Sequence, residues 1–186
     1  MSDDDFVEFC SKHPHLLIES NADGELILSP PPYTLTSARN AQILRQLTAW
    51  AETSNGIVLD PASLFILPNG ARRSPDAAWV SQDKISQLNP ETLDRYWMLC
   101  PDFVIELKSK TDRISTLRAK MLEWVAEGVS NGAQLAWLID PDTESLKIFR
   151  PAQDPEKLVQ PQSIAGEGPL DGFVLNLTRI WRPLDR

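Results

Sequence analysis

The sequence is poor in cysteine and has no long apolar run. Cys10 and Cys100 are its only cysteines and do not form a Cys-x-x-Cys pair, which excludes a disulfide scaffold and favours a reducing compartment. No stretch approaches the ~18 apolar residues of a membrane-spanning helix. The N-terminus opens with three aspartates and lacks the basic and apolar regions of a signal peptide. We therefore predict a cytoplasmic protein that makes no membrane contact.

Histidine is equally scarce, with only two in the chain. Cys10, His13 and His15 offer at most three ligands for a zinc ion, and no second ligand cluster accompanies them. We expect this N-terminal stretch to be a frayed surface segment rather than a metal site.

Positive charge is the third deficit, because 18 basic residues face 26 acidic ones and the formal net charge is −8. Proteins that coat nucleic acid non-specifically are usually basic, so this balance counts against that role, although it leaves room for a local basic patch. The glycine-rich nucleotide-binding motifs are absent. Nucleotide-binding classes therefore have no support in the sequence.

The composition itself is that of a globular protein, with 186 residues of which 42% are hydrophobic and 24% charged. This length is typical of one domain, which we predict over residues 1–186. Helical spacing predicts helices over 37–53 and 112–127, the second ended by Gly128. Short apolar or alternating runs predict strands at 16–19, 25–28, 57–59, 64–67, 76–80, 103–108, 135–139 and 146–149.

The order of these elements predicts the fold class. A helix between the strands at 103–108 and 135–139 implies a right-handed parallel crossover, and hairpins elsewhere make the sheet mixed. The proline-rich segments 30–32 and 151–161 are expected to be loops, and 89–97 holds at most a short helix. We predict an α/β fold in which helices flank a central mixed β-sheet.

The strand that begins near Phe103 carries charge on one face. Because side chains alternate along a strand, Phe103, Ile105 and Leu107 share an apolar face. Glu106 and Lys108 lie on the opposite face. Charged residues are seldom buried in such strands unless they are paired or bound to a ligand. A cross-strand ion pair at a sheet edge is one explanation, and a catalytic site is the other.

A second acidic residue favours the catalytic site. Asp76 follows Pro75 at the start of a predicted strand, 30 positions before Glu106. Two carboxylates make an oxygen site suited to Mg²⁺, which keeps several waters and takes few protein ligands. A lysine close by, such as Lys108, can orient or deprotonate an attacking water and stabilise the charge of a phosphoryl transition state. The three residue types together are those of a metal-dependent phosphodiesterase.

At these positions the chain resembles a known family. The resemblance rests on the segments Ser74–Asp76, Pro101–Ser109, Lys120–Trp124, Gly128 and Trp137–Pro141. They look like the Uma-two endonuclease family, which belongs to the PD-(D/E)xK, or restriction-endonuclease-like, superfamily. The likeness covers roughly residues 16–151. It implies a restriction-endonuclease-like fold and a Mg²⁺ cofactor, which Mn²⁺ could replace.

The resemblance also implies the site residues. The metal ligands would be Asp76, Glu106 and the backbone carbonyl of Leu107, and the catalytic residues Asp76, Glu106, Lys108 and Lys120. Lys120 matches a basic helix position near the active site, and a solvated lysine is the alternative.

Two other positions are compared with the family. Glu25 matches an N-terminal acidic position to which no role is assigned. A histidine that family members often carry is replaced here by the stretch Thr36–Arg39. This departure removes support for any histidine-assisted step.

The implied function is a Mg²⁺-dependent endonuclease that hydrolyses phosphodiester bonds of DNA. The alternative is a non-catalytic interaction module that keeps the nuclease fold, motivated by the net charge of −8. Nucleic acid, in particular DNA, is the expected partner. A homodimer is expected by analogy with nucleases that pair to cut two strands.

Arginine and tryptophan complete the candidates. Arg72 and Arg73 form the best basic pair for phosphate contact near Asp76, and a solvated turn would have the same sequence. Trp124 and Trp137 sit within core-like patterns, so we expect them to pack in the interior rather than stack on bases.

Overall fold

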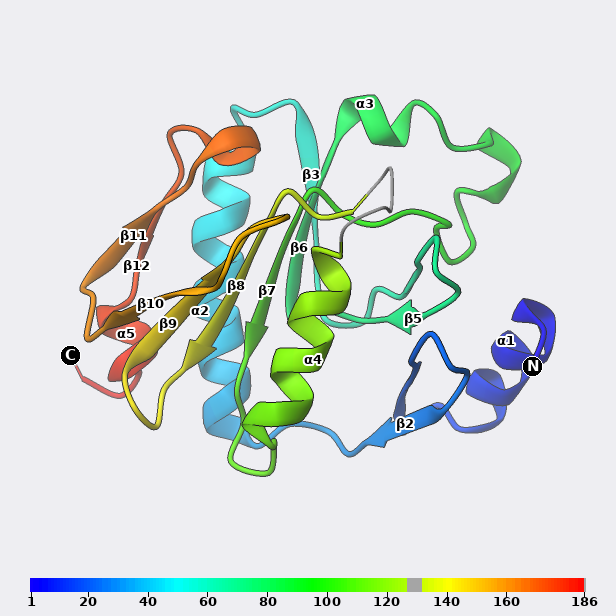
Figure 1. Cartoon of the computed structure of the whole chain (residues 1–186), viewed down its shortest axis with the longest axis horizontal. Coiled ribbons are helices and arrows are strands. Elements are labelled where there is room, and N and C mark those ends of the chain that lie inside the picture. Colours follow the sequence, from blue (N-terminus) through cyan, green and yellow to red (C-terminus); the bar gives the residue numbers. More distant parts are fainter. Residues whose placement is uncertain (127–131, 186) are drawn as a thin grey trace.

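A six-stranded mixed sheet forms the centre of the computed structural model, which describes residues 1–126 and 132–185 (Figure 1). Its order is β10-β9-β8-β7-β6-β3, and only β7 and β8 are parallel within it. The strands are β3 (Gly56–Leu59), β6 (Ala77–Ser81), β7 (Phe103–Leu107), β8 (Leu135–Asp140), β9 (Ser145–Phe149) and β10 (Glu156–Val159). The predicted α/β fold with a central mixed sheet is confirmed.

Two helices cover opposite faces of this sheet, α2 (Thr34–Ala51) behind it and α4 (Ile114–Trp124) in front in the view of Figure 1. Strand alternation explains the division. Phe103 and Ile105 pack with Ile43 of α2 in one core cluster, whereas Val104 packs with Met121 of α4 in another. Position 106 is therefore carried on the face that α4 covers.

The N-terminal region forms a second, four-stranded sheet of order β2-β1-β5-β4. Its strands are β1 (Leu17–Ser20), β2 (Leu26–Ser29), β4 (Phe65–Ile66) and β5 (Arg72–Arg73). Before it comes the helix α1 (Asp3–Lys12), so the expectation of a frayed segment around Cys10 is wrong. Ser2 and Asp5 form a capping box, and Phe6 is fully buried. The capping box and the burial of Phe6 stabilise α1, although few of its residues are apolar and buried.

The C-terminal region packs on the outer side of α2. A hairpin of β11 (Ser163–Ala165) and β12 (Val174–Asn176) leads into α5 (Thr178–Trp181), with a 3₁₀ turn, η2 (Gly168–Leu170), between its strands. The expectation of a loop over 151–161 is wrong in part, because β10 lies inside it. Prolines flank this edge strand without interrupting its pairing with β9.

The remaining predicted elements lie within a few residues of their expected places. The helix predicted over 112–127 is the shorter α4, and its expected end at Gly128 lies outside the described residues. The ambiguous stretch 89–97 contains a 3₁₀ turn, η1 (Pro90–Thr92), and a further short helix, α3 (Gln82–Ile85), follows β6. None of the helices described is long and apolar enough to cross a membrane. The single domain and the cytoplasmic location stay predictions.

Candidate active site

Asp76 and Glu106 lie side by side at one end of the central sheet. The antiparallel register pairs Ala77 of β6 with Ile105 of β7. Asp76, one residue before Ala77, and Glu106, one residue after Ile105, are therefore neighbours on the α4 face. Burial raises the pKa of Asp76. It also raises the pKa of Glu106 to about 8, with the negative charge of Asp76 adding to the shift. The sheet therefore brings together two carboxyl groups that the sequence separates by 30 residues.

Two donors fix the orientation of Asp76. Its Oδ2 accepts a hydrogen bond from the backbone N–H of Leu107 at 2.7 Å, and its Oδ1 accepts one from Asn40 Nδ2 at 2.8 Å. Asn40 reaches the carboxylate from the buried stripe of α2. Its own Oδ1 is buried and has no hydrogen-bond partner. Such an unpaired acceptor costs free energy.

Lys120 places its ammonium group among the acidic residues. Its Nζ lies 2.9 Å from Glu106 Oε1, 2.9 Å from Glu19 Oε1 and 2.7 Å from the carbonyl oxygen of Ser74. Three acceptors for three N–H protons satisfy the buried group completely. Burial lowers the pKa of Lys120, but the carboxylates of Glu106 and Glu19 outweigh burial and raise it overall. The alternative of a solvated lysine is wrong, because the side chain is 11% exposed.

Trp124 completes the surroundings of Glu106. Its indole Nε1 donates to Glu106 Oε1 at 3.0 Å, and its ring is fully buried in the core beneath α4. Trp137 is also buried, on the other face of the sheet. The prediction that both tryptophans pack in the interior is confirmed, and Trp124 also positions a carboxylate.

Lys108 lies apart from this cluster. Its Nζ is 2.8 Å from Asp142 Oδ2, in the turn after β8, and 3.9 Å from Asp140 Oδ1, at the end of that strand. The hydrogen bond to Asp142 is the main reason why the pKa of Lys108 is raised and that of Asp142 is lowered. The structure thus brings Asp76, Glu106 and Lys120 together and directs Lys108 toward the rim of the same end of the sheet. A catalytic role for Lys108 stays a prediction.

Glu19 and Asn40 are members of the cluster that the sequence analysis missed. Glu19 of β1 accepts from the N–H of Ser74 at 2.7 Å as well as from Lys120. Glu25, the acidic residue singled out instead, is exposed in the β1–β2 turn and hydrogen-bonds to Asn21. Asn40 could have been found, because it lies on the apolar stripe of a helix, where a polar side chain needs a partner.

Arg72 and Arg73 serve the fold. Both are buried, Arg72 pairs with Asp3 of α1, and Arg73 pairs with Glu123 of α4. Neither arginine is therefore free to contact a phosphate, and the two do not lie in a solvated turn, so both predictions for this pair are wrong. The two guanidinium groups attach helices α1 and α4 to the short strand β5.

The charge of the buried cluster suits a divalent cation. Asp76, Glu106 and Glu19 supply three carboxylates against the single ammonium of Lys120, which leaves an excess of about two negative charges when all are ionised. Across the described part of the chain, no group of three or more His, Cys, Asp or Glu residues is arranged to hold a metal. Mg²⁺ needs only one or two carboxylates, because waters complete its shell. The residues present therefore fit this ion.

A mixed sheet with paired carboxyl groups and a lysine at one end is the arrangement that the resemblance to restriction-endonuclease-like proteins implied. The comparisons agree, because a family model described as "Putative restriction endonuclease" matches residues 3–178. The chain belongs to this family, Uma2, and the membership supports a nuclease.

A solved structure shows the same fold. A crystal structure titled as a "putative nuclease belonging to DUF820" from Anabaena variabilis ATCC 29413 has a TM-score of 0.75 at 18% identity, over 89% of each chain. A cryo-EM structure of a DrdV–DNA complex overlaps 68% of this chain and 12% of that one, at 12% identity and a TM-score of 0.39. No curated protein matches the chain.

Proposed function

We propose that this protein is a Mg²⁺-dependent endonuclease that hydrolyses phosphodiester bonds of DNA. The observation that carries the proposal is the buried pair of carboxyl groups Asp76 and Glu106, which together with Glu19 outnumber the single ammonium group of Lys120 by three to one. A structural ion pair needs one carboxylate for one ammonium. Here the excess negative charge lies in the nuclease family's fold, at the end of the sheet where β7 finishes.

Asp76 and Glu106 would hold the cation, together with the backbone carbonyl of Leu107. When bound, Mg²⁺ would supply Lewis-acid stabilisation of the phosphate charge and lower the pKa of a bound water. Asp76 is oriented for this task before any ligand arrives, because Asn40 and the Leu107 N–H hold both of its oxygens.

Two lysines would act on the phosphate from different positions. Lys120 holds Glu106 and Glu19 in place, and its ammonium stays protonated at neutral pH because the carboxylates raise its pKa. It would therefore stabilise negative charge that develops on the phosphate rather than accept a proton. Lys108, held at the rim by Asp142, would contact the phosphate or orient the attacking water.

The test is a plasmid-nicking assay with Mg²⁺, Mn²⁺ or EDTA. We expect supercoiled DNA to be nicked with either cation and to stay intact with EDTA. Asp76→Asn keeps the shape of the side chain and removes its charge, so nicking should fall below detection. Asp94→Asn, at a surface position, is the matched control. Equal nicking by wild type and Asp76→Asn would disprove the assignment.

A non-catalytic interaction module remains the second candidate, motivated by the net charge of −8. Isothermal titration with Mg²⁺ or Mn²⁺ separates the two candidates without a substrate. The nuclease predicts cation binding that Asp76→Asn abolishes, whereas the module predicts none. A homodimer, which would place two sites on one duplex, is the expected assembly and is checked by light scattering.

A further inference from the structure

Two lysines without ion-pair partners face each other on the central sheet. The chain has seven lysines, and five of them, at 12, 84, 108, 110 and 120, form ion pairs. Lys147 of β9 and Lys157 of β10 form none with any residue that the structure describes, and the strand register places them directly opposite each other. Like charges opposite each other across a strand pair are unfavourable. The chain has 26 acidic residues, yet none that is described pairs with these two lysines. A bound anion would offset the repulsion between them.

The sheet register also connects these lysines to the candidate active site. Glu106 pairs with Leu138, Leu138 pairs with Lys147, and Lys147 pairs with Lys157. Residues in register share a face, so all four side chains lie in one row on the α4 side. With strands about 4.8 Å apart, Lys147 lies roughly 10 Å from Glu106 along this row.

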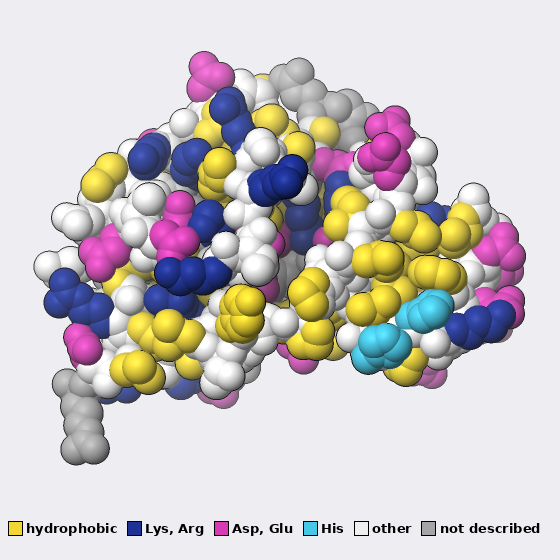
Figure 2. Space-filling view, turned by 90° about the horizontal axis from the view of Figure 1, so that it is seen from below, with side chains coloured by type: hydrophobic (Ala, Val, Ile, Leu, Met, Phe, Trp, Pro, Cys, Tyr) yellow, Lys and Arg dark blue, Asp and Glu magenta, His cyan; other side chains and the backbone are white. Residues whose placement is uncertain are grey.

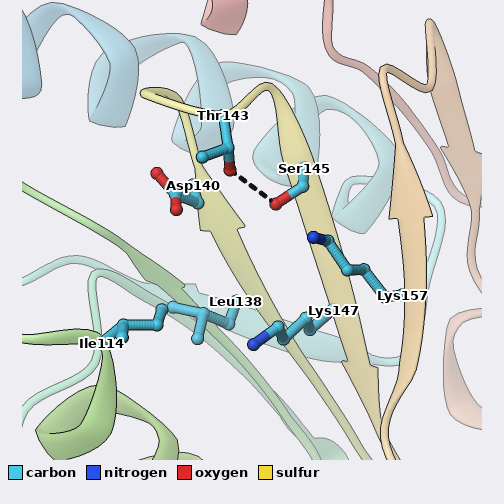
Figure 3. Close-up of a pocket in the computed structure, with 7 residues that line it drawn as sticks. All are labelled: Ile114, Leu138, Asp140, Thr143, Ser145, Lys147 and Lys157. Carbon is cyan, nitrogen blue, oxygen red and sulfur yellow. Dashed lines mark hydrogen bonds between the residues drawn. The ribbon is translucent and has the colours of Figure 1, made fainter.

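A surface cavity of about 150 Å³ lies where the two lysines meet (Figure 3). Both lysines line it: the ammonium group of Lys157 lies near the hydroxyl of Ser145, and that of Lys147 lies nearer Leu138. The hydroxyls of Thr143 and Ser145 lie 2.8 Å apart and bond to each other. A cavity of this volume is known to hold a benzene ring, and a phosphate group is smaller. Ammonium and hydroxyl groups are the usual donors to backbone phosphates.

One carboxylate, that of Asp140, also lines the cavity. Its Oδ1 already accepts a hydrogen bond from the N–H of Asp142 and lies 3.9 Å from Lys108 Nζ. Two ammonium groups against this one partly neutralised carboxylate leave the cavity positive. The space-filling view from the end where β7 and β8 finish agrees, because Lys and Arg gather over the central sheet and are sparse on the N-terminal side (Figure 2).

We propose that this cavity binds a backbone phosphate of the DNA strand at a distance from the bond that is cut. Lys147 and Lys157 would clamp that phosphate, while the hydroxyls of Thr143 and Ser145 turn toward it. Because Leu138 between the cavity and Glu106 is buried under α4, the strand would then run past the first turn of α4, at Ile114, toward Glu106. This inference rests on the proposed function and adds a positioning site to it.

The salt dependence of binding tests the proposal. The binding constant for a fluorescent DNA duplex is measured by anisotropy in EDTA at several salt concentrations. For Lys147→Gln/Lys157→Gln we expect weaker binding at low salt and a slope of log K against log [salt] that is smaller by about 1, as for the loss of one phosphate contact. Lys147→Arg/Lys157→Arg should keep the wild-type slope, because the charge is retained.

A matched control separates a local site from overall charge. Lys12→Gln/Arg45→Gln removes the same two charges from exposed positions on α1 and α2, so its slope should stay at the wild-type value. In nicking assays the Lys147/Lys157 glutamine variant should raise KM several-fold and leave kcat within about twofold, since neither lysine touches the cut phosphate. Its thermal midpoint should not fall, because a repulsive pair has been removed.

The outcomes distinguish this inference from the proposed function. An unchanged slope in the Lys147/Lys157 variant, with wild type that binds and nicks DNA, overturns the phosphate site alone. A slope that falls equally in the Lys12/Arg45 control also overturns it, because the effect is then general. Wild type that neither binds nor nicks DNA overturns both proposals.

Discussion

The two faces of the central sheet differ in the side chains that they bury. The α2 face of β7 is apolar, with Phe103 and Ile105 fully buried among aromatic and aliphatic side chains. The α4 face carries Glu106 next to Lys120, in a position where a leucine or a valine would cost nothing to bury. One five-residue strand therefore contributes a stabilising core on one side and a costly charged cluster on the other.

The difference shows where stability and function are separated. Replacing a buried ion pair with apolar residues is often neutral or stabilising, so the α4 face is not explained by stability. The apolar core on the α2 face offsets the free energy that is lost by burying charged groups on the α4 face. Substitutions on the two faces should consequently affect different observables, and the following four predictions test this division.

The largest effect is expected for Glu106→Gln. The substitution keeps the shape of the side chain and removes the charge that would bind the cation, so nicking should slow by about 10³-fold or more. This corresponds to an increase of roughly 4 kcal/mol in the activation free energy, at about 1.36 kcal/mol per factor of ten. Rates are measured on supercoiled plasmid at saturating Mg²⁺. Glu52→Gln, at the exposed end of α2, is the control and should nick as wild type does. A Glu106→Gln rate within threefold of wild type would contradict the division.

Next comes Phe103→Ala, on the opposite face of the same strand. Loss of a fully buried aromatic ring should lower the free energy of unfolding by about 3–5 kcal/mol, measured by urea denaturation. The rate per folded molecule should change by less than about threefold, because the ring lies away from the carboxylates. Leu184→Ala, at a side chain that is 81% exposed, is the control and should be silent. Loss of activity in molecules that remain folded would break the comparison.

The two lysines near the site provide a finer test. Lys120→Met removes the ammonium that contacts Glu106 and should slow nicking by about 10²-fold, comparable to the loss of one preorganised donor. Lys108→Met should slow it by about tenfold or less, because Asp142 holds that side chain at the rim. Circular dichroism checks that both variants are folded. The reverse order of the two effects would assign the central role to Lys108.

The smallest effect is on pH dependence. Burial raises the pKa of Glu106 to about 8 from an ordinary value of 4.5, so the native state holds a proton that the unfolded chain releases between these values. Stability must therefore fall as pH rises through this window, by about 1 kcal/mol between pH 7 and 8. Cation binding should strengthen over the same range, because the proton and the cation compete for one carboxylate. Urea and calorimetric titrations at several pH values measure the two trends, and both should be smaller in Glu106→Gln, which leaves only the raised pKa of Asp76 in the pair.

The sequence was sufficient for the central sheet because its strands carry local signals. The alternation around Phe103 predicted both faces of β7, and the helix before β8 predicted the parallel crossover. The strand β10 was missed because its neighbours are prolines, and α1 was missed because its stability comes from a capping box and one buried ring, Phe6. Edge strands and short capped helices depend on tertiary contacts that periodicity does not report.

The candidate site was predicted only in part, for a similar reason. Asp76, Glu106 and Lys120 were found through strand context and family resemblance. Glu19 was missed because it contacts Lys120 from a different sheet. The pattern of a four-residue strand does not predict a contact of this kind. Arg73 was misread because its partner Glu123 lies 50 residues away in the sequence.

Trp124 gives the protein an optical and magnetic reporter of its own. Its indole N–H is bonded to Glu106 Oε1, so the electron distribution of the ring responds to whether that carboxyl group is protonated, ionised or bound to a cation. The indole ¹H–¹⁵N resonance that disappears in Trp124→Phe would therefore follow the state of the carboxylate directly. Occupancy of the acidic pair becomes visible in this way without any substrate.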